Sequence, residues 1–370
     1  MPNEPGRLPR DMSALVLGAF GGPDALEPRT VPRPEPKGRE VLIRVAYCGV
    51  CRHDLLTRAG AFPGIDLPVI LGHQVSGTVV ARGPEATAHA VGDRVMTLIY
   101  TGCGDCAECR AGNAALCRVE RPRFLGEDMD GGYAEYVAVR EDTVVAVPDA
   151  VPLVDASILT CTYGTAYHAI VTRGAIQAGE TVVVTGASGG VGLHALRVLA
   201  WRGARTLAVT SSADKAPELE AAGAEVIVAP DRRFAPAVKE RTGGRGADAV
   251  LEIVGGPTLR ESIHAVRSGG RVVLVGNVEG GAAEIRPAHF ILKEISLIGT
   301  KSCRADEVRA VLDLMGQGVL PVRIGAVYDL PQGAEVHRAM ERGEAVGRLA
   351  IRVAGESENR FQSPMKPLSP

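Results

Sequence analysis

The chain has 370 residues, of which 46% are hydrophobic and 23% charged, the composition of an ordinary globular protein. Its formal net charge of −2 argues against a nucleic-acid or membrane-surface partner, because both need concentrated basic residues. This length is too great for one hydrophobic core, so we expect two domains. Apolar runs fall short of the ~18 residues of a membrane span. The opening residues carry no apolar signal segment, so we expect a cytoplasmic protein.

The first half of the chain predicts a β-rich unit over about residues 12–150. Short β-branched runs are separated by glycine and proline turns, as in antiparallel sheets. These runs are Val41–Ala46, Gly77–Ala81, Tyr133–Val139 and Val144–Val147. Residues 1–11 and 355–370 are rich in proline, serine and charge, and we expect them to be flexible tails.

Four closely spaced cysteines lie inside this β-rich unit. Their pattern is C-x2-C-x2-C-x7-C, formed by Cys103, Cys106, Cys109 and Cys117. Four thiolates can surround one Zn²⁺ tetrahedrally, and four protein ligands leave no position open for a substrate. The run therefore predicts a structural zinc lobe.

From about residue 162 the pattern changes to alternating strands and helices. We expect helices over Val191–Gly203 and Asp214–Gly223. The expected strands are Thr181–Thr185, Thr206–Thr210, Glu225–Val228, Ala249–Ile253, Arg271–Val275 and Ile295–Ile298. This alternation predicts a doubly wound parallel sheet with right-handed crossovers. A helix, Ala305–Gly316, and a strand, Arg348–Val353, follow it.

The segment VVVTGASGGVG follows the first of these strands and opens a helix. A plain tight turn is the alternative, but the strand–turn–helix–strand context favours a dinucleotide site, where free N–H groups meet the pyrophosphate. The residues expected to bind the cofactor here are Ser188, Gly189, Gly190, Val191 and Gly192.

The end of the next strand indicates which nicotinamide cofactor is bound. An NAD site places a carboxylate there for the ribose 2′-hydroxyl, whereas this chain has Ser211 and Ser212, followed by Lys215. Hydroxyl groups and an ammonium group suit a 2′-phosphate, so we expect NADP(H) over NAD(H). The serines could instead serve to cap the next helix, which is compatible with the same role.

Taken together, several motifs carry a family resemblance. GVC-x-x-D holds Cys51 and Asp54, GH-x-x-x-G holds His73, and Gly92-Asp93-Arg94-Val95, the four-cysteine run and Cys161 follow in order. Over about residues 13–354 the chain resembles the zinc-dependent medium-chain alcohol dehydrogenases. The resemblance implies a GroES-like catalytic domain, residues 12–161 with 302–354, and a Rossmann domain, residues 162–301.

The resemblance also implies the roles of individual residues. Cys51, His73 and Cys161 bind a catalytic zinc with one open position, so that each chain holds two zinc ions. Asp54 orients His73. The remaining implied positions contact the cofactor (Arg52, Thr165, Val275, Asn277 and Arg348) or line the substrate pocket (Phe62, Ile99 and Tyr100).

Three positions depart from the family pattern. His53 stands where the family usually has serine or threonine, Leu56 replaces a common relay histidine, and Gln74 replaces the glutamate of the GHE motif. Because Leu56 cannot transfer protons, we expect His53 to act as the proton carrier.

These observations predict a zinc-dependent oxidoreductase that interconverts an alcohol with an aldehyde or ketone, using NADP(H) or NAD(H). One alternative is reduction of an activated C=C bond, of the enoyl, acryloyl or quinone type. Another is a zinc- and nucleotide-binding protein, or a tailoring enzyme, without net redox turnover. The expected partners are a small-molecule substrate and further copies of the chain, as a homodimer or homotetramer.

Overall fold

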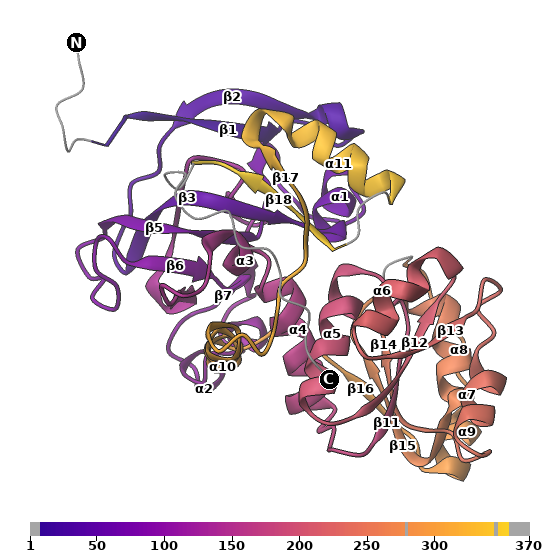
Figure 1. Ribbon diagram of the computed structural model, residues 1–370. Helices are drawn as coiled ribbons and strands as arrows, with labels where there is room; N and C mark the ends of the chain where they lie inside the picture. The colour runs from indigo at the N-terminus through magenta and orange to yellow at the C-terminus, as the bar shows by residue number, and fades with distance from the viewer. Residues whose placement is uncertain (1–7, 278–279, 344–346, 355–370) are drawn as a thin grey trace.

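The computed structural model describes residues 8–277, 280–343 and 347–354. A β-rich part and an α/β part lie side by side, and the last strands of the chain return to the β-rich part (Figure 1). No helix of the described ranges is both long and apolar enough to span a bilayer.

The β-rich part is built on a seven-stranded sheet in the order β10-β6-β5-β3-β18-β17, with β9 also paired to β3. β3 lies in the core of this part, and its residues Val41, Leu42, Ile43 and Val45 are all fully buried. The strands of this part are β1 (Asp11–Leu17), β2 (Leu26–Pro32), β3 (Glu40–Val50), β4 (Val69–Ile70), β5 (Gln74–Arg82), β6 (Arg94–Thr97), β7 (Tyr100–Thr101), β8 (Arg123–Phe124), β9 (Tyr136–Arg140), β10 (Val144–Ala146), β17 (Ile324–Asp329) and β18 (Arg348–Arg352).

β18 runs antiparallel to β3, with Leu349 opposite Val50. This pairing carries Arg348 to the end of β3, directly beside Cys51. Three helices belong to this part of the molecule, α1 (Arg52–Arg58), α2 (Ala107–Arg110) and α11 (Gly333–Arg342). The C-terminal segment therefore contributes residues to the same site as the N-terminal sheet.

The predicted doubly wound sheet is confirmed: six parallel strands lie in the order β13-β12-β11-β14-β15-β16. The strands are β11 (Thr181–Val184), β12 (Arg205–Thr210), β13 (Glu225–Val228), β14 (Ala247–Glu252), β15 (Val266–Leu274) and β16 (Ser296–Gly299). The helices are α5 (Gly190–Trp201), α6 (Ala216–Ala221), α7 (Ala235–Arg241), α8 (Gly256–Ala265) and α9 (Pro287–Lys293). The order reverses between β11 and β14, so the ligand crevice is expected at the carboxyl ends of these two strands.

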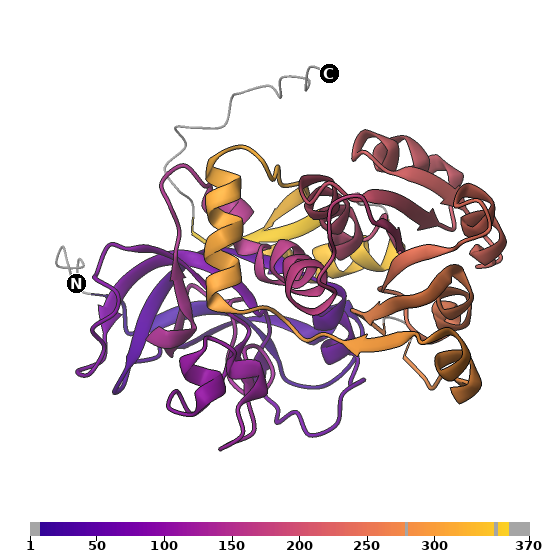
Figure 2. The ribbon, with the colours of Figure 1, turned by 90° about the horizontal axis from the view of Figure 1, so that it is seen from below.

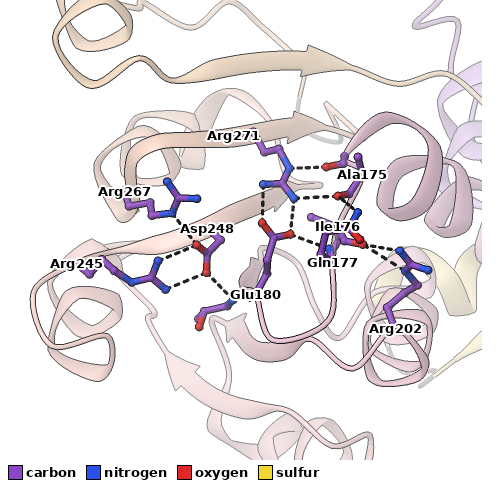
Figure 3. A network of polar contacts seen from close by, with 11 residues as sticks. Ala175, Ile176, Gln177, Glu180, Arg202, Arg245, Asp248, Arg267 and Arg271 are labelled. Atoms are coloured by element: carbon purple, nitrogen blue, oxygen red, sulfur yellow. Dashed lines mark hydrogen bonds and ion pairs between the residues drawn. The ribbon is translucent and has the colours of Figure 1, made fainter.

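The opposite, amino-terminal edge of this sheet is held by ion pairs (Figure 3). Asp248 accepts hydrogen bonds from Arg245 at 2.8 Å and Arg267 at 2.6 Å, and from the Thr181 backbone N–H at 2.8 Å. Arg271 bonds Glu180, directly before β11, at 3.0 Å. These contacts join β11, β14 and β15 at the end of the sheet opposite the expected ligand crevice. We therefore infer that they stabilise the sheet and do not take part in ligand binding.

Short helical segments connect the two parts. They are α3 (Leu153–Ser157), a π-helical turn (Thr160–Gly164), α4 (Thr165–Tyr167), a second π-helical turn (His168–Arg173) and the returning α10 (Ala305–Gly316). His168 Nδ1 lies 2.9 Å from Glu307 of α10, which ties the two connections together. Figure 2 shows α10, in orange, standing against these segments. Within the described residues, short 3₁₀ turns lie at Pro23–Ala25, Ala114–Leu116, Glu141–Thr143, Ala213–Lys215 and Leu330–Gln332.

Candidate metal sites and cofactor edge

The four predicted zinc cysteines converge on one point in the lobe between β7 and β8. All four sulfur atoms lie within 4.8 Å of one another, and each side chain is half-buried. Backbone N–H groups of Cys103 and Glu120 lower the pKa of the Cys117 thiol to about 6. Four thiols, at least one of them readily ionised, fit a closed tetrahedral Zn²⁺ site.

The backbone of the lobe needs glycine at two positions. A Cβ on Gly102 would lie 2.7 Å from the Cys109 sulfur, and Gly104 has a φ of +85°, which disfavours other residues. Both glycines flank Cys103, so they let the first ligand turn toward the other three.

The second predicted metal site is buried and is gathered from distant parts of the chain. His73 Nε2 lies 3.3 Å from the sulfur atoms of both Cys51 and Cys161. Cys51 follows β3, and His73 precedes β5, its antiparallel neighbour. Cys161 lies in the π-helical turn, a conformation frequent at functional sites.

Asp54 fixes the orientation of His73. Its carboxylate accepts hydrogen bonds from His73 Nδ1 at 3.0 Å and from the Cys51 backbone N–H at 2.8 Å. Burial opposes protonation of His73, but Asp54 and the two neighbouring sulfur atoms outweigh it and raise its pKa. The neighbouring Cys161 side chain and His73 lower the pKa of Cys51, which favours a thiolate there.

This donor set fits a zinc ion. The three ligand atoms lie within 4.8 Å of one another, and they combine two soft sulfur atoms with an imidazole nitrogen. Three protein ligands leave one coordination position for a small molecule. Because Nδ1 of His73 is taken by Asp54, Nε2 is the nitrogen that faces the sulfur atoms.

His53 lies beside this triad, with its ring centroid 5.6 Å from that of His73. Its ring is stacked between Phe62 and Phe124, each at 4.6 Å. His53 Nε2 lies 2.7 Å from Glu127 Oε1. Burial raises the pKa of Glu127, but hydrogen bonds from His53 and Thr57 outweigh it and hold the pKa below its ordinary value.

Sequence reasoning missed both Glu127 and Phe124. Glu127 is 74 residues from His53, and no local spacing connects them. Of the expected pocket residues, Phe62 stacks on His53, and Tyr100 meets Phe124 edge to face at 5.1 Å. An aromatic wall therefore surrounds His53 on both faces.

The glycine turn forms the first turn of α5, with Gly189 as its N-cap residue. A Cβ on Gly192 would lie 2.4 Å from the Gly186 carbonyl oxygen, and a Cβ on Gly189 would lie 3.3 Å from the same oxygen. Gly190 is constrained by another residue, because its Cβ would lie 2.3 Å from Arg348 Nε. The structure thus brings Arg348 to the N-terminus of α5, where an anion would be stabilised.

Arg348 is mostly buried and connects the cofactor edge to the metal triad. One guanidinium nitrogen donates to the Cys161 carbonyl oxygen at 2.9 Å, and Nε has no hydrogen-bond partner among the described residues. Thr165, also expected near the cofactor, donates its hydroxyl to Thr160 at 3.1 Å. Arg52 is exposed at the first position of α1.

Ser211, Ser212 and Lys215 follow β12, as predicted, but a carboxylate lies among them. The Ser212 hydroxyl donates to Asp214, and both Ser211 and Asp214 are exposed. Ser212 occupies the N-cap of the next turn without making a capping hydrogen bond. Sequence reasoning overlooked Asp214, which weakens the inference that no negative charge opposes a 2′-phosphate.

A cavity of about 410 Å³ lies at the carboxyl ends of β14, β15 and β16. Val275 and Asn277, which were expected near the nicotinamide, both line it. Asn277 Oδ1 accepts a hydrogen bond from the Gly256 backbone N–H at 3.4 Å. The cavity is on the ligand edge of the sheet.

Comparison with known proteins matches two parts of the chain to family models. Residues 37–149 match the alcohol dehydrogenase GroES-like domain, and residues 190–317 match the zinc-binding dehydrogenase domain. An acryloyl-coenzyme A reductase of Sulfurisphaera tokodaii is 34% identical over 92% of this chain and 100% of its own length. An NAD-dependent alcohol dehydrogenase of the same organism is 31% identical, over 92% and 99%.

Solved structures agree with this comparison. The crystal structure of AibC has a TM-score of 0.88 at 41% identity, covering 93% of this chain and 96% of that one. That of an NAD-dependent alcohol dehydrogenase has a TM-score of 0.86 at 32% identity, covering 93% and 100%. The predicted family is confirmed: this chain belongs to the zinc-binding medium-chain dehydrogenase/reductase family and is an oxidoreductase.

Proposed function

We propose that the protein reduces a C=C bond conjugated to a thioester carbonyl, with a nicotinamide cofactor as reductant. Hydride adds to the β-carbon and a proton to the α-carbon, so the double bond becomes a single bond. The proposal draws support from two acryloyl-coenzyme A reductases that are 34% and 35% identical to this chain. The sequence analysis instead favoured the interconversion of an alcohol with an aldehyde or ketone and kept C=C reduction as the alternative.

One structural observation carries the proposal. The family's hydroxyl relay to solvent is replaced by His53, whose Nε2 is engaged by Glu127 and whose faces are covered by Phe62 and Phe124. Reversible proton transfer at an alcohol oxygen needs an open route to water, which Leu56 does not provide. Protonation of carbon likewise takes one proton per turnover, which His53 Nδ1 delivers directly to the substrate without a hydroxyl relay.

The residues of the chain divide into three tasks under this proposal. When bound, zinc held by Cys51, His73 and Cys161 supplies Lewis-acid polarisation of an oxygen, and the nicotinamide supplies hydride. Glu127 accepts a hydrogen bond from His53 Nε2 and fixes the ring, which leaves Nδ1 as the atom available to the substrate. Phe62 and Phe124 cover the two faces of the His53 ring, while 33% of that side chain stays exposed. A proton-carrying role of His53 stays a prediction.

Interconversion of an alcohol with an aldehyde or ketone is the second candidate. The intact set of two thiols and one imidazole favours it, because this ligand set suits direct polarisation of a substrate oxygen. The similarity to alcohol dehydrogenases, at 30–32% identity, also supports it.

NADP(H) stays the proposed cofactor on the strength of Ser211, Ser212 and Lys215, against the opposing charge of Asp214. Replacing Lys215 with alanine is expected to lower kcat/KM for NADPH about tenfold and to leave that for NADH unchanged. Equal losses with both cofactors would contradict a 2′-phosphate contact.

We propose a homodimer formed through the edge of the parallel sheet. β16 is an edge strand, and Leu297 on it is partly exposed, while Ile291 and Leu292 on the neighbouring α9 are 74% and 82% exposed. Such a group of apolar residues on an unpaired strand favours a protein contact. Sedimentation equilibrium would distinguish a dimer from a monomer.

A substrate panel tests the proposed reaction. NADPH oxidation is measured with an α,β-unsaturated acyl thioester, its saturated thioester, a ketone and an aldehyde of matched carbon number. The proposal predicts that kcat/KM for the unsaturated thioester exceeds the others by at least about 100-fold. Preference for the ketone or aldehyde would establish the second candidate. Nucleotide binding without oxidation of NADPH by any of the four would favour the non-redox alternative.

A further inference from the structure

A carboxylate is completely buried at the point where the strand order of the parallel sheet reverses, and no sequence motif singles it out. Glu252 is the last residue of β14 and has no exposed surface. The crevice expected for a ligand opens at the carboxyl ends of β14 and its neighbour β11. A buried charge is costly unless hydrogen bonds satisfy it, so the partners of Glu252 are informative.

One oxygen atom of Glu252, Oε1, accepts hydrogen bonds from two separate segments at this crevice. Thr185, the residue after β11, donates its hydroxyl at 2.8 Å. The backbone N–H groups of Val254 and Gly255 donate at 3.0 and 2.9 Å, and the Thr258 hydroxyl donates at 2.7 Å. This oxygen therefore joins the start of the glycine turn to the loop between β14 and α8.

The other contacts of the Thr185 hydroxyl determine where its hydrogen points. The hydroxyl oxygen accepts the Ile253 backbone N–H at 2.9 Å. Its own hydrogen is left for Glu252, which is closer than the Leu251 carbonyl oxygen at 3.4 Å. The second carboxylate oxygen, Oε2, accepts the Ser262 hydroxyl of α8 at 2.5 Å. Uncharged donors thus meet both oxygens, which suits an ionised, acceptor-only carboxylate.

The loop held by this carboxylate forms one wall of the cavity of about 410 Å³. Gly255 and Gly256 line the cavity on that side, and Asn277 lines it from the next strand. Gly255 has a φ of +97°, and a Cβ there would lie 2.5 Å from Asn277 Oδ1. The Gly256 backbone N–H donates to the same oxygen at 3.4 Å. Because the two sides touch, a shift of the loop would also move Asn277.

The main chain of Glu252 holds the facing wall of the same cavity. Its carbonyl oxygen accepts the backbone N–H groups of Val275 at 2.8 Å and Gly276 at 3.3 Å. Both residues line the cavity, and Val275 is one of those expected beside the nicotinamide. The side chain and the main chain of a single residue therefore fix two walls of the cavity.

From these contacts we infer that Glu252 is a positioning residue for the nicotinamide end of the cofactor, because it holds both walls of the cavity and ties them to the glycine turn. The inference rests on the proposed nicotinamide cofactor. Walls that are fixed before binding lower the ordering cost that the ligand must meet. The residues proposed for the adenosine end follow β12, on the other side of β11 from Glu252. Loss of these contacts should therefore weaken the nicotinamide end alone.

Nucleotides with and without the nicotinamide ring separate these two ends. Dissociation constants are measured by calorimetry for NADPH and for 2′-phospho-ADP-ribose, which lacks the ring. NADH and ADP-ribose form a parallel pair. Glu252→Leu removes both acceptor oxygens, and we expect it to weaken binding of the dinucleotide about tenfold or more. The nucleotide without the ring should bind as it does to the parent.

A milder variant decides the outcome if Glu252→Leu does not fold. Thr258→Val keeps the shape of the side chain and removes one hydrogen bond to Glu252. We expect it to weaken binding of the dinucleotide about threefold, again without a loss for the nucleotide that lacks the ring. Glu252→Gln retains an acceptor oxygen and should bind the dinucleotide more tightly than Glu252→Leu.

Glu261→Gln is the matched control, because it alters a carboxylate on the same helix. Glu261 accepts the backbone N–H groups of Phe234 and Ala235 at 3.1 and 3.0 Å, and it lies outside the lining of the cavity. It should leave the dissociation constants of both nucleotides unchanged.

The pairs of nucleotides also distinguish failure of this inference from failure of the proposed cofactor. Equal losses for both members of a pair, or unchanged dinucleotide binding in every folded variant of Glu252 and Thr258, would overturn the inference. A parent protein that binds none of the four nucleotides would overturn the proposed cofactor itself.

Discussion

The four-cysteine lobe and the Cys51–His73–Cys161 triad use similar donor atoms in opposite surroundings. The lobe collects its sulfur atoms from fifteen consecutive positions in a small, half-exposed loop. The triad is assembled from the residue after β3, the residue before β5 and a π-helical turn, and His73 is supported by the buried Asp54. A closed set of four ligands can stabilise a fold, whereas three ligands beside a cofactor edge can perform chemistry. A change confined to one metal site should therefore leave the other intact.

Loss of a lobe ligand should have the largest effect on stability. Cys106→Ser leaves three thiols in a loop with little hydrophobic core of its own, so zinc binding there should fail. Structural zinc contributes an apparent ~10–16 kcal/mol of folding free energy in small zinc-finger peptides. Loss of even part of this free energy should lower Tm by more than about 10 °C. Differential scanning calorimetry and zinc content measure the change, and an unchanged Tm would show that the lobe folds without metal.

Loss of a triad ligand should instead have a large effect on turnover and a small effect on stability. Cys161→Ser replaces a soft ligand by a hydroxyl of similar size, so packing is preserved while metal binding is weakened. We expect kcat/KM to fall by about a thousandfold or more, with Tm changed by only a few degrees. Turnover that survives at a tenth of the original rate would mean that this site is not the centre of the reaction.

The spacing of the ligand residues along the chain explains why the lobe could be predicted from sequence alone. Cysteines at intervals of two and seven residues form one site in almost any loop, so the sequence contains the geometry. Cys51, His73 and Cys161 have no informative spacing, and family resemblance was needed to connect them. The six-stranded sheet was likewise predictable, because it follows from the alternation of buried strands and helices.

The long-range partners of the site residues could not be predicted. Glu127 reaches His53 across 74 residues, and Glu252 reaches Thr185 across 67. Such contacts depend on the loop after β8 and on the side chains that meet at the ends of β11 and β14, which no periodicity encodes. Asp214 was visible in the sequence as the start of the next helix, but nothing in its spacing indicates that its side chain turns back to Ser212.

An intermediate effect on turnover is expected at His53 and Glu127, the hydrogen-bonded pair beside the triad. Glu127→Gln keeps the shape of the side chain but removes the charge that fixes His53, so the ring loses a strong acceptor at Nε2. We expect kcat to fall about 10–100-fold with Tm nearly unchanged. Steady-state kinetics measure this, with Glu284→Gln, an exposed change in the other domain, as control. Equal rates in the two variants would exclude a role for the pair.

The smallest effect concerns the pH dependence of stability, and it should arise at Asp155 and not at either metal site. Asp155 lies in α3, which packs against β3 and β5, and burial raises its pKa to about 6. An unfolded aspartate has a pKa near ~3.9, so ionisation is costlier in the folded state. Stability should therefore fall as pH rises from about 4 to 6, and the cost stays above pH 6.

Asp155→Asn should remove that cost. We expect the variant to be more stable than the parent by about 1–3 kcal/mol at pH 7.5 and equal to it at pH 4. Urea unfolding at the two pH values measures the difference. A variant that is less stable at pH 7.5 would show that the carboxylate has a compensating partner.

Selective removal of one metal tests the division of roles most directly. The protein is loaded with zinc and dialysed against a chelator, and zinc content, NADPH oxidation and Tm are measured on the same samples over time. The account predicts that turnover disappears as the first equivalent of zinc leaves, while Tm stays within a few degrees until the second is lost. Turnover that persists with one equivalent remaining, or that falls only together with Tm, would contradict it.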